Sequence, residues 1–281
     1  LERQAESEFL IAVEAQERRG AKPTIRLSAP IEPDWLLDLF ADSVKESIEV
    51  VWDNRTEKVV VTSRLLYGAL VLDESAKGTP PPGEVERILA HHALLAGPEA
   101  FADKEALAAL KLRSSFAHSL DETFPELGDE QAREALKELV EGRRSFNDLR
   151  AADLLANLRG RLTHAQSVML ERLAPAEVTL PGGRRVKVHY APSQPPWIES
   201  RLQDFFGMAQ GPAVGAGRVP LVLHLLAPSQ RPVQITRDLA GFWVRHYPAI
   251  RRELCRRYPR HSWPEDPLTA PPPPPQGRRR G

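Results

Sequence analysis

The stretch that decides the fold lies near the C-terminus, from Pro220 to Pro267. It reads PLVLHLLAPSQRPVQITRDLAGFWVRHYPAIRRELCRRYPRHSWPEDP. Two apolar runs on either side of a Pro-rich turn predict a pair of strands. An aromatic-rich segment at 238–247 and an arginine-rich segment at 248–258 then predict two helices, with Pro248 in the first turn of the second one. The stretch therefore predicts a packed hairpin-plus-helix module with a basic outer face.

The arginine-rich helix separates its residues by face. Ile250, Leu254 and Tyr258 fall on one side at helical spacing, which leaves Arg252 and Arg256 on the opposite side. Outward cations of this kind are suited to contacts with phosphates. The candidate nucleic-acid-binding residues are cations of this helix, of the tail and of an upstream hairpin: Arg252, Arg256, Arg260, Arg278, Arg279, Arg280, Arg184, Arg185 and Lys187. The alternative is that the arginines form a solvated helix face paired with an acidic part of the chain.

The overall charge is balanced, but its distribution is not. Lys+Arg and Asp+Glu number 38 each. Residues 84–141 contain 13 acidic and 6 basic residues, whereas residues 237–281 contain 10 arginines and 4 acids. The single cysteine, Cys255, rules out an internal disulfide framework, and no apolar run approaches the ~20 residues that span a bilayer. We therefore expect a cytoplasmic chain with no membrane partner, and the start at Leu1 indicates a piece of a longer polypeptide.

The remaining sequence predicts an α+β protein in several parts. Valine-rich strands interrupted by one helix predict a small β-barrel or curled sheet of about five strands over residues 1–77. After a Gly/Pro linker, residues 84–175 predict a helical block, with Thr163 and Gln166 as a capping box. Residues 176–268 begin with a hairpin and, after Pro195-Pro196, a predicted helix that ends at Gly207. Residues 269–281 are a Pro-rich basic tail.

No catalytic or metal site is predicted. The sequence has neither a G-x-x-x-x-G-K-S/T phosphate loop nor a D-E-x-H box, and no ligand set with zinc spacing. Cys255 is expected to be an inert packed thiol, and Trp197, Trp243, Tyr247 and Trp263 are expected in the core rather than as stacking platforms. We expect no enzyme activity and no cofactor in these 281 residues.

Several stretches resemble one known family. The stretches VPLVLHLLAPSQRPVQITRDLAGFW and RRYPRHSWPEDP are similar to the C-terminal domain of the HrpB-type DEAH-box ATP-dependent RNA helicases. The similarity extends upstream, through residues 178–190, EGRRSF (141–146), SRLLYGALVLDES (63–75) and IEPDWLLDLF (31–40).

The resemblance implies an architecture and a parent protein. In that family two RecA-like domains bind ATP and RNA, and winged-helix, helical and OB-like domains and the C-terminal region follow. By this resemblance residues 1–77 are an OB-like domain, truncated at its start, 84–175 a helical connector and 176–268 the family's C-terminal domain. ATP and Mg²⁺ are then expected in the parent helicase core, with RNA and that core as partners. Three readings stay open: an accessory RNA-binding region, a structural or protein-docking module, and an independent enzyme with an unfamiliar site.

Overall fold

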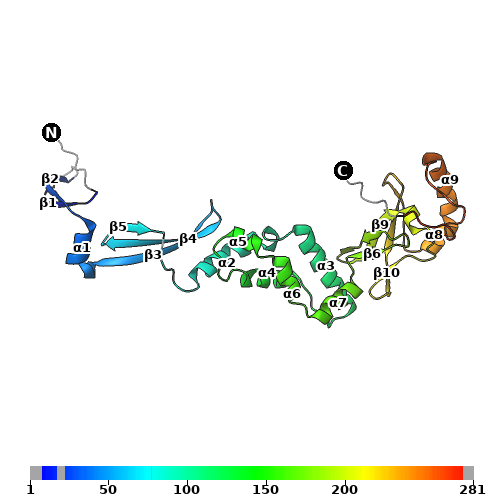
Figure 1. Cartoon of the computed structure of the whole chain (residues 1–281), viewed down its shortest axis with the longest axis horizontal. Coiled ribbons are helices and arrows are strands. Elements are labelled where there is room, and N and C mark those ends of the chain that lie inside the picture. Colours follow the sequence, from blue (N-terminus) through cyan, green and yellow to red (C-terminus); the bar gives the residue numbers. More distant parts are fainter. Residues whose placement is uncertain (1–7, 18–22, 77, 275–281) are drawn as a thin grey trace. The chain divides into compact units, whose positions relative to one another are not determined.

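The computed structural model describes residues 8–17, 23–76 and 78–274 and is a mixed α+β structure (Figure 1). Its helices and strands are gathered into two compact units. Residues 1–95 with 140–148 form the first unit, and residues 96–139 with 149–281 form the second. The finer division into an OB-like domain, a connector and a C-terminal domain stays a prediction.

The first unit contains the five expected strands, in two separate antiparallel sheets. One is the hairpin of β1 (Leu10–Gln16) and β2 (Thr24–Pro30). After α1 (Pro33–Leu39) and a 3₁₀ turn at Ala41–Ser43, the other is a meander in the order β3-β4-β5. Its strands are β3 (Val44–Asp53), β4 (Lys58–Tyr67) and β5 (Leu70–Ser75). Among the described residues no sheet closes on itself, because β1 and β2 pair only with each other.

Helix α2 (Glu84–Ala96) and the segment around Ser145 complete the first unit. The Trp52 ring stacks on His92, with ring centroids 4.5 Å apart and planes at 12°, and its centroid lies 4.7 Å from that of Phe146. Backbone bonds tie the segment to β4, since Val59 N donates to Arg144 O at 2.8 Å. Residues 140–148 therefore belong with the sheet although they lie far from it in sequence.

The second unit begins with a helical block. A short 3₁₀ turn at Pro98–Ala100 precedes it. Its helices are α3 (Lys104–Leu120), α4 (Asp129–Glu138), α6 (Leu154–Gly160) and α7 (His164–Leu173), together with the end of α5 (Phe146–Ala151), which begins in the first unit. The predicted capping box is present, because Gln166 N donates to Thr163 Oγ1 and Thr163 N donates to Gln166 Oε1. Fully buried leucines form the core: Leu107, Leu136, Leu149, Leu154 and Leu158.

A four-stranded mixed sheet follows. The predicted hairpin, of β6 (Glu177–Thr179) and β7 (Arg185–Lys187), precedes this sheet in the chain. The sheet has the order β13-β12-β9-β8, in which β9 and β12 are parallel. Its strands are β8 (His189–Ala191), β9 (Gln194–Arg201), β12 (Val222–Leu226) and β13 (Pro232–Thr236). The connection from β9 to β12 contains a 3₁₀ turn at Leu202–Phe205 and the small β10 (Ala213–Val214) and β11 (Val219–Pro220) pair.

The prediction of a helix after Pro195-Pro196 is wrong. Those residues begin β9, which pairs with β8 on one side and β12 on the other. Buried Ile198 and Ser200 alternate with more exposed Trp197 and Glu199, which is the period of a strand. The helix-like spacing of apolar residues arose because a 3₁₀ turn, whose Leu202 and Phe205 are also buried, follows the strand directly.

The two predicted C-terminal helices are present. They are α8 (Leu239–Arg245), capped by Asp238, and α9 (Tyr247–Arg257). Phe242, Trp243 and Tyr247 are buried, and Phe206 contacts the last two rings. Trp243 Nε1 donates to Met208 O at 2.8 Å, and Tyr247 Oη donates to Pro264 O at 2.8 Å. Burial raises the pKa of the Tyr247 phenol to about 12, so that it remains a hydrogen-bond donor at neutral pH.

Candidate nucleic-acid interface

The basic face of α9 forms because one side of the helix is needed for packing. Leu254 is buried and Ile250 is half-buried, while Arg252 and Arg256 on the opposite side are exposed. Arg260, just past the helix, is exposed as well. The helical spacing therefore places Arg252 and Arg256 in solvent, and Arg260 is a third exposed candidate cation beyond the helix.

The exposed arginines differ from Arg251 in what they contact. Arg251 donates from Nε to Trp263 O at 2.8 Å and pairs with Glu265 at 3.3 Å, so it fastens the segment after the helix. Arg252 Nε donates only to Pro248 O of its own helix, at 3.3 Å. Within the described ranges, Arg256 and Arg260 have no carboxylate at ion-pair distance. Their charges are therefore not neutralised by a neighbouring acid there.

The β6–β7 hairpin holds the second group of candidate cations, and two of the three are engaged. Arg185 Nη2 lies 2.6 Å from Glu177 Oε2 of the opposite strand. Arg184 Nε lies 3.5 Å from Asp204 Oδ2. Lys187 is exposed and has no ion-pair partner in the described part of the chain. Of this group, Lys187 is the cation most open to a ligand.

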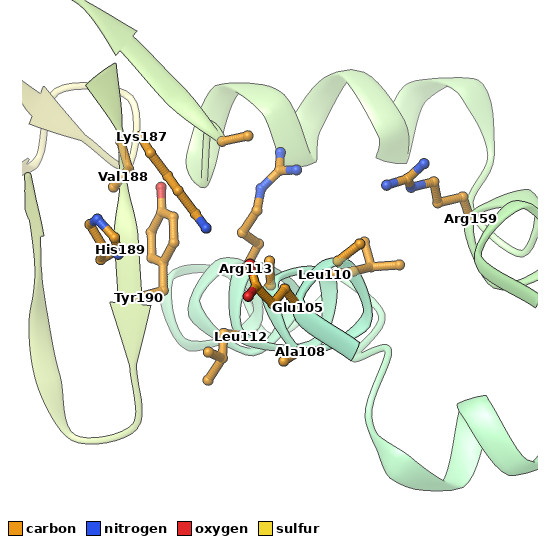
Figure 2. Close-up of a pocket in the computed structure, with 13 residues that line it drawn as sticks. Glu105, Ala108, Leu110, Leu112, Arg113, Arg159, Lys187, Val188, His189 and Tyr190 are labelled. Atoms are coloured by element: carbon orange, nitrogen blue, oxygen red, sulfur yellow. The ribbon is translucent and has the colours of Figure 1, made fainter. Parts of the chain in front are cut away.

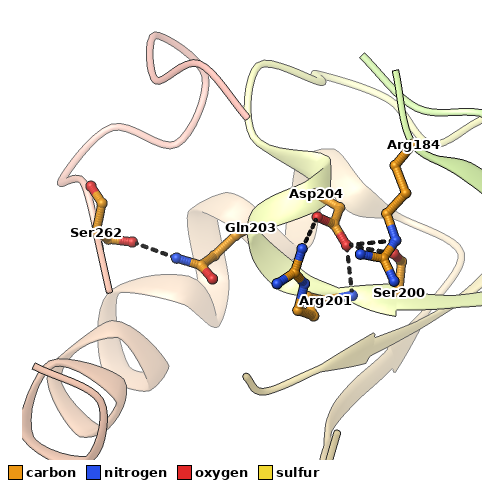
Figure 3. A network of polar contacts seen from close by, with 6 residues as sticks. All are labelled: Arg184, Ser200, Arg201, Gln203, Asp204 and Ser262. Carbon is orange, nitrogen blue, oxygen red and sulfur yellow. Dashed lines mark hydrogen bonds and ion pairs between the residues drawn. The ribbon is translucent and has the colours of Figure 1, made fainter. Parts of the chain in front are cut away.

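The Asp204 carboxylate explains why Arg184 is engaged (Figure 3). Asp204 is only 2% exposed, yet Oδ2 accepts from Ser200 Oγ at 2.6 Å and from Arg201 N at 3.1 Å. Arg201 Nη2 donates to Oδ1 at 3.3 Å. A buried carboxylate is stable only when it is paired and hydrogen-bonded, so this cluster has a structural role that joins the hairpin to the sheet.

The described tail leads back toward the same hairpin. The site where a Cβ of Gly182 would stand lies 2.8 Å from Pro273 O and 3.4 Å from the Pro272 ring. A glycine at this turn therefore permits the close approach of the proline segment. Arg278, Arg279 and Arg280 lie outside the described residues.

An apolar cavity of about 400 Å³ lies between α3 and the β7–β8 segment (Figure 2). Lys187 and Arg113 project toward it, and Arg159 lies at its far end. Arg113 is already engaged, since its Nε donates to Ala174 O at 2.6 Å and its Nη2 pairs with Glu171. Tyr190, at one wall, donates to Pro175 O, and burial raises the pKa of its phenol. The cavity is lined mainly by apolar atoms, and Lys187 is among its lining residues.

Three rings on the sheet were not among the predicted site residues, and the expectation that Trp197 lies in the core is wrong, because it is half-buried on the outer face of β9. His189, Trp197 and His224 come from β8, β9 and β12, and all three are half-buried. The His189 and Trp197 centroids are 5.1 Å apart at 14°, and those of Trp197 and His224 are 6.2 Å apart at 20°. The alternation of Trp197 and Glu199 with Ile198 and Ser200 could have indicated a strand in this segment. We call these three residues the ring row.

The described ranges show neither a metal-binding cluster nor a membrane-spanning helix. No group of three or more His, Cys, Asp or Glu residues in them is placed to hold a metal ion. No helix there is long and apolar enough to cross a membrane. Cys255 is a free, half-buried thiol.

Comparisons with known proteins give a consistent answer. Residues 135–267 match the family described as HrpB_C, ATP-dependent helicase C-terminal. The chain is 32% identical over 262 residues to the ATP-dependent RNA helicase HrpB of Escherichia coli K12, covering 90% of this chain and 32% of that protein. A crystal structure of the E. coli DExH-box NTPase HrpB aligns with a TM-score of 0.65 and 31% identity, over 95% of this chain and 34% of that one. A structure of the E. coli DEAH/RHA helicase HrpB aligns with a TM-score of 0.56 and 29% identity, over 92% of this chain and 33% of that one.

Residues 135–267 therefore fall in the class described as ATP-dependent helicase C-terminal. Within that class, the resemblance predicted from the sequence is confirmed: this is a C-terminal region of the HrpB type. The chain spans about a third of the length of the relatives it matches.

Proposed function

We propose that this chain is a non-catalytic accessory region of an ATP-dependent RNA helicase and helps to hold RNA beside the motor domains. The parent would be the helicase, and its core would bind ATP and Mg²⁺. RNA, in single-stranded form and with low sequence specificity, and the core of the same parent chain are the proposed partners. The cytoplasm is the proposed location, in keeping with the single cysteine.

The observation that carries this proposal is the set of outward cations on and after α9. Arg252, Arg256 and Arg260 are exposed, and no carboxylate of the described chain lies at ion-pair distance from them. Such charges attract a phosphate backbone and release its condensed counterions without reading sequence. An OB-like arrangement of β1–β5, if completed by other parts of the parent, would add a groove suited to a single strand.

A salt titration tests the proposal. Binding of fluorescent single-stranded RNA is measured from low to physiological salt, with the 281-residue chain and the variant R252Q/R256Q/R260Q. For single strands each phosphate contact contributes about 0.7 to the slope of log K against log salt, so loss of three contacts lowers the slope by about 2.

The control variant loses the same three positive charges, but from helices other than α9. R87Q/R133Q/R172Q removes three exposed arginines from α2, α4 and α7. We expect this control to keep the wild-type slope. Binding that ignores salt, or an equal loss in both variants, would contradict a role for the α9 cations.

A second function is favoured by a separate observation. Large apolar side chains of β1, β2 and α1 are exposed: Ile11, Val13, Ile25, Leu27, Trp35 and Leu39. Contiguous exposed apolar surface is typical of protein interfaces. This unit would then dock on the helicase core or another protein and position it.

Gel filtration separates the two functions. If docking is correct, the chain co-elutes with the separately expressed core of its parent, and W35S/L39S abolishes the complex without changing RNA affinity. If the complex survives that double change, the apolar face is not the docking surface.

A further inference from the structure

The outer face of the four-stranded sheet presents one side chain from each strand in a diagonal row. His189 of β8 is opposite Trp197 of β9, and His224 of β12 is opposite Ile235 of β13. Trp197 and His224 are joined across the parallel pair by ring stacking, since Trp197 faces Val222, two residues before His224. The ring row and Ile235 therefore cross the whole sheet.

This face is the solvent side of the sheet. Ile235 is 56% exposed, and the three rings are half-buried, whereas Ile198 and Leu223, on the other face, are fully buried. Packing of the core does not require a tryptophan and two histidines at these outer positions, where polar residues ordinarily lie. The rings stand nearly parallel, as the 14° and 20° interplanar angles show.

Two cations without an acidic partner lie close in sequence to the outer strands that carry the two ends of the row. Lys187 precedes His189 by two residues, and Arg237 directly follows β13. Both are exposed, and neither has an ion-pair partner in the ranges that the structure describes. The carboxylate on this face, Glu199, is engaged by His224, with Oε1 3.2 Å from Nδ1. The unpaired charges that flank the row's outer strands in sequence are therefore positive.

We infer that the ring row is a base-stacking surface for single-stranded RNA, with Lys187 and Arg237 contacting the flanking phosphates. The inference rests on the proposed function and assigns it a second, base-contacting surface. Unstacked bases bind aromatic side chains on a sheet face because every base has a π-face, so such a site tolerates any sequence. Trp197 holds the two imidazole rings parallel, and a base that continues the stack gains contact area that a phosphate backbone alone does not provide.

The test compares two strands of equal charge. Oligouridine of about 12 nucleotides, within the site sizes of single-strand-binding folds, is titrated against the 281-residue chain beside an abasic strand of the same length. The variants are W197A, which removes the central ring, and W197F, which keeps a ring. V244A is the control, because Val244 is 78% exposed on α8 and lies outside the ring row. Circular dichroism checks that each variant is folded.

We expect W197A to weaken oligouridine binding by at least about fivefold, the lower end of measured base-stacking effects. Its affinity for the abasic strand should not change, W197F should retain most of the affinity for oligouridine, and V244A should bind like the wild type. If W197A weakens binding of both strands equally, or of neither, the inference is overturned. If the wild type still binds in a salt-dependent way, the proposed function stands. A wild-type chain that binds neither strand overturns both.

Discussion

Replacing Asp204 by alanine should strongly destabilise the second unit. The change leaves the guanidinium of Arg201, whose side chain is 11% exposed, without its carboxylate, and Arg201 Nε already has no hydrogen-bond partner among the residues that the structure describes. It also leaves Ser200 Oγ and Arg201 N without their acceptor. Removing one partner of a buried ion pair costs about 3–5 kcal/mol of unfolding free energy. The pair with Arg184, which is 37% exposed, adds at most about 1 kcal/mol.

This cost translates into a measurable shift in melting temperature. For a unit of this size 1 kcal/mol corresponds to about 2–4 °C, so D204A should lower the Tm by about 10 °C. Thermal unfolding is followed by tryptophan fluorescence, because Trp197, Trp243 and Trp263 all belong to this unit. The double variant R201M/D204L replaces the ion pair with apolar groups and should recover the part of the loss that comes from the unpaired Arg201 charge, but not the part from Ser200 Oγ and the residue 201 N–H. A shift below about 2 °C for D204A would refute the reasoning that the carboxylate is essential to the buried cluster.

Two further predictions concern local structure. T163A removes the side-chain acceptor for Gln166 N and should lower the unfolding free energy by about 1 kcal/mol in urea denaturation, whereas T269A, in the exposed segment after α9, should cost much less. Burial and the charge of His91 lower the pKa of His92, which stacks on Trp52, so the unfolded chain binds more protons near that pKa. Stability of the first unit should therefore be greatest above the ordinary pKa of histidine and fall as the pH drops below it; H92Q should reduce that fall, and an unchanged pH profile would count against the assignment.

Local signals in the sequence predicted most of the C-terminal module. The turn between β12 and β13 and the proline in the first turn of α9 act on a few neighbouring residues, so they can be read without knowing the fold. The faces of α9 follow from a 3.6-residue period in the same way. The hairpin at Gly182 was also predicted, because its turn residues specify the turn by themselves.

What the sequence did not reveal depends on partners distant along the chain. β9 was taken for a helix because its pairing with β12, some 25 residues away, cannot be seen locally. The ring row was missed for the same reason, since its members are brought together only by that pairing. The engagement of Arg184 with Asp204 likewise depends on how the hairpin packs on the sheet. Tertiary pairing overrides the local apolar period at such positions.

The parallel pairing of β9 and β12 has a consequence for how the second unit folds. The sheet consists of two hairpins, β8–β9 and β12–β13, each of which forms between neighbours in the chain. Pairing between neighbours in the chain is favoured early, whereas the central pair joins residues about 25 positions apart, and such non-local contacts slow folding. The slow event in building this sheet should therefore be the docking of one hairpin on the other.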